Sequence, residues 1–168
     1  MKRDFSYLNI SKASQESINK ARQLIMKITD KHVRASVVGN MFLAMFADGK
    51  RTPEEMNWLT AACMEFGSTQ EETLALFKKM MTPGEHTVIT VVPKDVHERA
   101  KQLMPVVIMT IIDGNFDSRE MEFLCRYAGI LGFEPDKTGE LVEFVSESID
   151  QGLDKNTVYA GLEKFLKK

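Results

Sequence analysis

Hydrophobic residues recur every three or four positions along almost the whole chain, and this spacing predicts an all-α fold. Two stretches, residues 41–47 and 106–112, are apolar on every side, which indicates helices buried all round rather than surface helices. Amphipathic stripes flank them, as expected for helices that cover a core. These stripes follow Ser14 (Ile18, Ala21, Leu24, Ile25, Ile28), Thr52 (Met56, Leu59, Cys63, Phe66), Ser68 (Leu74, Phe77, Met80 or Met81), Asp136 (Leu141, Val145, Ile149) and Asn156 (Val158, Leu162, Phe165, Leu166).

The pattern is also duplicated at an offset of 65 residues. Without any gap, ten of the 38 positions from 30 to 67 are identical to those from 95 to 132, where average composition would give about two. The identical pairs are Asp30/Asp95, His32/His97, Arg34/Arg99, Ala35/Ala100, Asp48/Asp113, Gly49/Gly114, Glu55/Glu120, Met56/Met121, Leu59/Leu124 and Gly67/Gly132. Two copies of one unit usually stack to share a core. We therefore expect a single-domain helical bundle over 1–168, built from two pseudo-symmetric helix-pair repeats, about 30–67 and 95–132, with C-terminal helices over 136–168.

Helix start and stop signals support the repeat boundaries. Asp48-Gly49 and Asp113-Gly114 each follow a buried helix, where glycine can close the helix in the left-handed conformation. Thr52-Pro53-Glu54-Glu55 is typical of a helix start, with a capping threonine, a proline in the first turn and a glutamate that reaches back to the cap. The Asp117 to Glu120 stretch repeats this arrangement.

One stretch, residues 81–93, lacks a helical pattern. Its residues 87–92 are mostly β-branched, and no second strand is evident to pair with them. We interpret it as an extended crossover between the two repeats. The alternative is an exposed edge that adds to another chain or accepts a peptide.

Composition narrows the functional classes. The chain has 168 residues, 43% hydrophobic and 27% charged, and a net charge of −2, which disfavours nucleic-acid binding by bulk electrostatics. No apolar stretch approaches the length of a membrane span, and no apolar run follows the basic start, so neither insertion nor a secretory signal is expected and a cytoplasmic location is favoured. Cys63 and Cys125 lie in apolar helical patterns and are predicted to be buried thiols. Most of the eleven methionines are expected in the core; an adaptable methionine-rich groove is the alternative.

The two Asp-Gly turns, Ala47 to Glu55 and Ile112 to Glu120, resemble the TerB-like helical family. This is the domain type of the tellurite-resistance protein TerB, also found at the start of some membrane-anchored J-domain co-chaperones. The likeness covers about residues 30–133, and the chain departs from it at Ile112, where the family often has alanine, and at Pro105 inside the second buried helix. It implies an all-helical, non-enzymatic bacterial module in stress response or membrane-associated complexes. Cation binding proposed for the family's acidic residues would involve Asp48, Glu55, Asp113 and Glu120 here.

A divalent-cation site is also suggested by the acidic turns themselves. Gly49 and Glu55 keep the spacing of positions six and twelve in a calcium-binding EF-hand, but positions one and three would be Met45 and Ala47, so the turn is not an EF-hand. If the two turns approach each other, their carboxylates could supply oxygen ligands for an ion such as calcium. The candidate ligands are Asp48, Glu55, Asp113, Asp117 and Glu120. Capping alone accounts for the same spacing and is the favoured interpretation.

His32 and His97 are the remaining candidates for metal binding or acid–base catalysis. A pair near a two-fold axis could bind zinc or act as acid and base. No H-x-x-x-H or E-x-x-H spacing and no catalytic motif is present, so we expect both in the first turns of buried helices and no enzymatic activity. The sequence thus favours a non-catalytic interaction or stress-sensor module that binds a protein partner. A divalent-cation-binding protein is the alternative, and a homodimer is compatible with either.

Overall fold

The structure is a computed structural model, and it describes residues 15–47, 52–82, 88–112 and 118–167. Within these ranges every regular element is helical, which confirms the all-α prediction. The α-helices are α1 (Gln15–Arg22), α2 (Lys31–Phe46), α3 (Pro53–Phe66), α4 (Gln70–Met81), α5 (Val96–Ile112), α6 (Ser118–Ile130), α7 (Thr138–Gln151) and α8 (Lys155–Leu162). Two short 3-10 turns, η1 (Pro135–Lys137) and η2 (Glu163–Phe165), lie before α7 and after α8.

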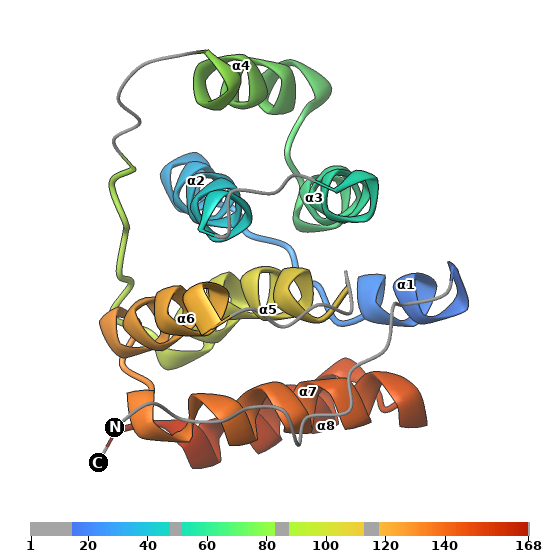
Figure 1. Ribbon diagram of the computed structural model, residues 1–168, viewed down its shortest axis with the longest axis vertical. Helices are drawn as coiled ribbons and strands as arrows, with labels where there is room; N and C mark the ends of the chain where they lie inside the picture. The colour runs from blue at the N-terminus through green and yellow to red at the C-terminus, as the bar shows by residue number, and fades with distance from the viewer. Residues whose placement is uncertain (1–14, 48–51, 83–87, 113–117, 168) are drawn as a thin grey trace.

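The helices are stacked in layers (Figure 1). α7 and α8 lie at one end of the molecule, α5 and α6 form the next layer, α2 and α3 follow, and α4 lies at the other end. The two helices that contain the fully apolar stretches of the sequence, α2 and α5, make the most extensive helix pair. Residues 88–95, which lead into α5, run along one side of the layers.

The two repeats begin in the same way. In α2, Oδ1 of Asp30 accepts the main-chain N–H of His32 at 2.8 Å. In α5, Oδ1 of Asp95 accepts the main-chain N–H of His97 at the same distance. An aspartate cap satisfies a main-chain donor that the first helical turn leaves open, so the identities at these positions preserve one local structure twice.

The repeats also share an arginine contact and a glycine turn. The Arg34 guanidinium donates to the carbonyl oxygen of residue 29, and the Arg99 guanidinium donates to that of residue 94, in each case five residues earlier. Gly67 and Gly132, which follow α3 and α6, have φ of 99° and 90°. This left-handed region is strained for residues with a Cβ, which explains why both copies carry glycine.

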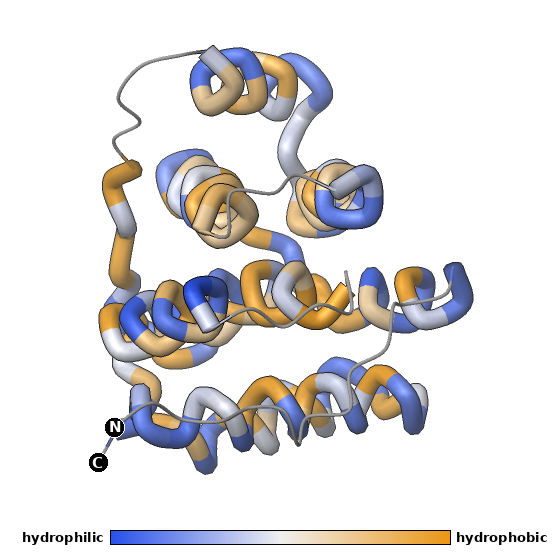
Figure 2. Tube along the Cα trace, viewed as in Figure 1, coloured by the Kyte–Doolittle hydropathy of each residue, from blue (hydrophilic) through white to orange (hydrophobic). Residues whose placement is uncertain are grey.

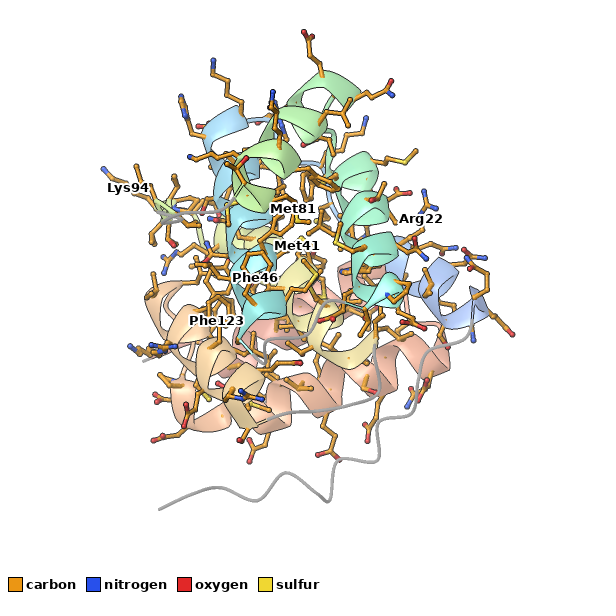
Figure 3. The ribbon with its side chains drawn as sticks, turned by 45° about the horizontal axis from the view of Figure 1, so that its top comes forward. Arg22, Met41, Phe46, Met81, Lys94 and Phe123 are labelled. Atoms are coloured by element: carbon orange, nitrogen blue, oxygen red, sulfur yellow. The ribbon has the colours of Figure 1, made fainter. Side chains whose placement is uncertain are left out.

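The buried side chains form one hydrophobic core that includes residues of all eight α-helices. Five methionines predicted on or near apolar faces are core residues, with exposures of at most 1%. They are Met41, Met45, Met104, Met109 and Met121. Figure 3 shows Met41 among the packed helices.

The helix predicted after Ser14 is shorter than its stripe suggests. α1 ends at Arg22, although Leu24 and Ile28 are buried as predicted. The main chain beyond Arg22 bonds to other parts of the molecule: the Leu24 carbonyl oxygen accepts from the Tyr159 hydroxyl at 2.8 Å, and the Ile28 N–H donates to the carbonyl of residue 66 at 2.9 Å. Tertiary contacts therefore replace the helical ones.

The cysteine prediction is correct for Cys63, which is buried, and burial raises the pKa of its thiol to about 12. Cys125 is half-buried, and both thiols are free. Among the helices described, none combines the length and apolar character needed to cross a membrane.

Candidate functional site

The predicted acidic ligands are only partly within the described ranges. Asp48, Asp113 and Asp117 lie outside the described residues. Glu55 and Glu120 occupy equivalent positions in the first turns of α3 and α6, and each is 1% exposed. In the ranges that the structure covers, no three histidine, cysteine, aspartate or glutamate side chains form a group that could hold a metal ion.

Glu55 forms the predicted capping box. Its main-chain N–H donates to Oγ1 of Thr52 at 3.1 Å, and its Oε1 accepts the main-chain N–H of Thr52 at 3.2 Å. The Thr52 hydroxyl also lies 3.0 Å from the same carboxylate oxygen. The capping function predicted for this glutamate is therefore confirmed.

The two equivalent histidines lie in the first turns of α2 and α5, as predicted, and both are exposed. Their surroundings differ. His32 faces α4 and the crossover, whereas Nε2 of His97 lies 3.7 Å from Oε1 of Glu163 beyond α8. The repeat therefore gives them equivalent positions in their helices but different neighbours.

α4 is weakly covered by the rest of the protein. Met80 is the one buried residue of this helix, all of which is described. Leu74 and Met81 are 60% and 41% exposed, and Leu76 is half-buried. An amphipathic helix that leaves this much apolar surface in water is typical of a partner-binding element.

An ion pair joins α4 to α2. The Arg34 Nε and Nη2 atoms donate to the two carboxylate oxygens of Glu72 at 2.9 and 3.0 Å. This bidentate hydrogen bond is the main reason that the pKa of Glu72 is lowered and that of Arg34 is raised. In the second repeat, the position equivalent to Glu72 is Lys137. A lysine cannot form this ion pair with Arg99, the equivalent of Arg34, so the pair is found only in the first repeat.

The crossover is held on α2 and α5 by buried polar side chains. The Val91 N–H donates to Oγ of Ser36 at 3.1 Å, and the Val91 carbonyl oxygen accepts from Nε2 of Gln102 at 2.8 Å. Nδ2 of Asn40 donates to Oγ1 of Thr90 at 3.1 Å. Two of these side chains satisfy the main-chain N–H and C=O of Val91, as a neighbouring strand would, and the third binds the Thr90 hydroxyl.

We call the hydrogen bonds of Ser36, Asn40 and Gln102 to the crossover the polar clamp. Beside it, a glycine of α2 permits a close approach of the crossover to that helix. A Cβ at Gly39 would lie 2.7 Å from Cγ1 of Val88, so a residue with a side chain would force Val88 to move. In the described residues 88–93 no β-strand forms, and α4 extends to Met81, the first residue of the stretch predicted to be non-helical. Ile89, in contrast, is 78% exposed, and Figure 2 shows the segment as a largely hydrophobic run at the side of the molecule.

A cleft of about 280 Å³ lies between α2, α4 and the crossover; we call it the crossover cleft. Its lining is predominantly apolar. The lining residues are His32, Ala35, Ser36 and Gly39 from α2, Leu76, Lys79 and Met80 from α4, and Val88, Ile89 and Val91 from the crossover. One wall is fixed by the polar clamp, and another is the weakly covered helix α4.

Sequence reasoning missed this cleft. A signal was present: Ser36, Asn40 and Gln102 are polar residues inside helices predicted to be buried, and buried polar groups need partners. The main chain of the crossover was the unpartnered segment that could supply them. Nothing in the spacing showed that α4 would be so weakly covered, because its own stripe predicts an ordinary core-facing helix.

A scan of protein-family models, a search of characterised proteins and a search of solved structures each found no match to this chain. The likeness to the TerB-like family therefore stays a prediction that rests on the two Asp-Gly turns and their spacing.

Proposed function

We propose that this chain is a non-catalytic interaction or stress-sensor module of the TerB-like type, and that it binds a protein partner at the crossover cleft. The observation that carries the proposal is the apolar cleft itself, together with Ile89, a lining residue that is 78% exposed. Contiguous exposed apolar surface next to polar residues is typical of protein-binding sites.

The energetic argument is clearest for Ile89. Its side chain is 78% exposed although the adjoining main chain is fixed by the clamp. Fully burying an isoleucine side chain stabilises a complex by roughly 1.5–3 kcal/mol, which corresponds to a tenfold or greater change in Kd. Because the neighbouring backbone is already ordered, a partner would bury Ile89 at a small entropic cost.

The proposal is tested by co-purification from the native host. Proteins recovered with the tagged wild-type chain are quantified beside those recovered with Ile89→Glu. Ile130→Glu, on α6, is the matched control because Ile130 is also largely exposed, at 54%. We expect a specific protein to be lost with Ile89→Glu and kept with Ile130→Glu. Equal recovery with all three chains would contradict the proposal.

A further inference from the structure

The described residues that line the crossover cleft include basic side chains and no carboxylate. Lys79 and His32 line it, and Lys78 and Lys31 are their neighbours in sequence. Lys94 follows the crossover, at the outer edge of the molecule and on the side opposite Arg22 (Figure 3). Within the described part of the chain, these four lysines form no ion pair.

Two carboxylates close to these cations in sequence or structure have partners of their own. Glu72 is bound by Arg34, and Asp30 caps α2 through the His32 N–H. These carboxylates keep their charge, as does Asp95, which caps α5 beside Lys94. None of them lines the cleft, so the charged side chain that a partner meets among its described lining residues is Lys79.

Negative charge gathers at the other end of the molecule. The outer face of α7 exposes four acidic side chains at helical spacing, Glu140, Glu143, Glu147 and Asp150. α4 and α7 lie at opposite ends of the layers (Figure 1). An acidic partner is thus attracted to the α4 end and repelled from the α7 end, which orients its approach.

The cleft is large enough to receive side chains of a partner. Its volume of about 280 Å³ lies at the lower end of the roughly 300–1,000 Å³ of sites for drug-sized ligands. One or two large apolar side chains fit such a space. The clamp on Val91 and the contact of Val88 with Gly39 fix the crossover wall before any partner arrives, and a preorganised wall lowers the entropic cost of binding.

From these observations, and resting on the proposed function, we infer that the crossover cleft receives a partner segment that carries a large apolar side chain flanked by aspartate or glutamate. The apolar side chain enters the cleft among Leu76, Met80 and Val88. The flanking carboxylates lie against Lys79 and the adjacent cations. Charge complementarity selects the segment, and the apolar side chain supplies most of the affinity.

The test uses the full chain and fluorescein-labelled twelve-residue peptides with one central leucine or phenylalanine. The flanking residues are acidic in one set, basic in a second and serine–glycine in a third. Binding is measured by fluorescence anisotropy at low and high salt. We expect the acidic set to bind most tightly, to weaken with added salt, and to lose binding when serine replaces the central apolar residue.

The charge of the cleft is tested by Lys79→Glu, which we expect to weaken binding of the acidic set about tenfold or more. Lys137→Glu is the matched control, since Lys137 is another exposed lysine outside the cleft. No preference for acidic flanks, or equal effects of the two substitutions, would overturn the inference. Binding to phosphatidylglycerol vesicles, weakened by Lys79→Glu, with no peptide binding would also overturn it and would assign the cleft to anionic lipid.

The inference and the proposed function fail separately. If the co-purifying protein is lost with Ile89→Glu but the peptides show no charge preference, the protein-binding function stands and the acidic segment is wrong. If no protein depends on Ile89 but acidic peptides bind with the expected dependence on Lys79, the cleft recognises this chemistry and the proposed cellular partner is wrong.

Discussion

Val88 packs directly over the backbone of Gly39, so closely that a Cβ at position 39 would lie 2.7 Å from Cγ1 of the valine. This contact sets the distance between the crossover and α2, and with it one wall of the crossover cleft. Glycine inside a helix costs about 1 kcal/mol relative to alanine. The close approach of the crossover offsets that cost, because it allows the clamp residues to reach the crossover main chain.

Gly39→Ala should therefore destabilise the protein in spite of its better helix propensity. Overpacking typically costs about 1–3 kcal/mol, which at its lower end equals and otherwise exceeds the gain of about 1 kcal/mol from replacing glycine in a helix. Val88→Ala removes the clashing methyl groups, so the double variant should be more stable than the sum of the two single changes predicts. Denaturant unfolding of the four chains measures this coupling, and additive effects would show that the contact does not set the spacing.

The clamp predicts a local effect of Ser36→Ala. This change removes the acceptor of the Val91 N–H, so the Val91 amide should exchange its hydrogen roughly tenfold faster or more, given about 1–3 kcal/mol for a buried group left unpaired. Ser148→Ala is the control, because Ser148 is equally buried but donates to the carbonyl of residue 144, away from the crossover. Unchanged exchange at Val91 in Ser36→Ala would argue against the clamp.

Acid should loosen α4 through Glu72. Because Arg34 lowers the pKa of this carboxyl in the folded state, the pair stabilises the fold above the ordinary carboxyl pKa of about 4.3. That stability is lost as the pH falls through the lowered folded-state pKa. Glu72→Gln should cost about 1–2 kcal/mol at neutral pH and flatten this part of the acid unfolding profile.

The control for this prediction is Glu65→Gln, which breaks the more exposed Arg22–Glu65 pair. Its cost should be smaller, on the order of 0–1 kcal/mol. If the two substitutions shift the acid unfolding profile equally, the Arg34–Glu72 pair has no special role in holding α4.

Glu55 distinguishes a capping function from cation binding. On the capping account, Glu55→Ala should cost about 0.5–2 kcal/mol while Glu55→Gln costs little, since glutamine also completes a capping box. The cation-binding alternative predicts saturable calcium binding in calorimetric titration of the chelator-treated protein, lost in the double variant Glu55→Gln/Glu120→Gln. Calcium binding that persists in the double variant would exclude these two carboxylates as ligands.

The fold was largely predictable because its signals are local and duplicated. The Asp30 and Asp95 caps and the Gly67 and Gly132 turns are encoded by neighbouring residues, and the repeat supplies each signal twice. The early end of α1 was not predictable, since it depends on bonds to Tyr159 and to residue 66, far away in sequence.

The candidate site was less predictable for the same physical reason. The cleft depends on how α4, α2 and the crossover meet, and no local pattern encodes that distance. The polar residues Ser36 and Gln102 within buried helices indicate that a buried polar contact exists, but their positions do not show that the crossover is the partner. The family resemblance drew attention to the acidic turns, where Glu55 functions as a helix cap.

The most direct measurement is site-specific photo-cross-linking in the native host. A photoreactive amino acid is placed at position 89 beside the cleft or, as the control, at position 130 on α6; both native side chains are largely exposed. A protein-interaction function predicts one discrete cross-linked protein from position 89 that is absent from position 130. No cross-linked protein from position 89, or the same products from both positions, would contradict the assignment of the crossover cleft as the partner-binding site.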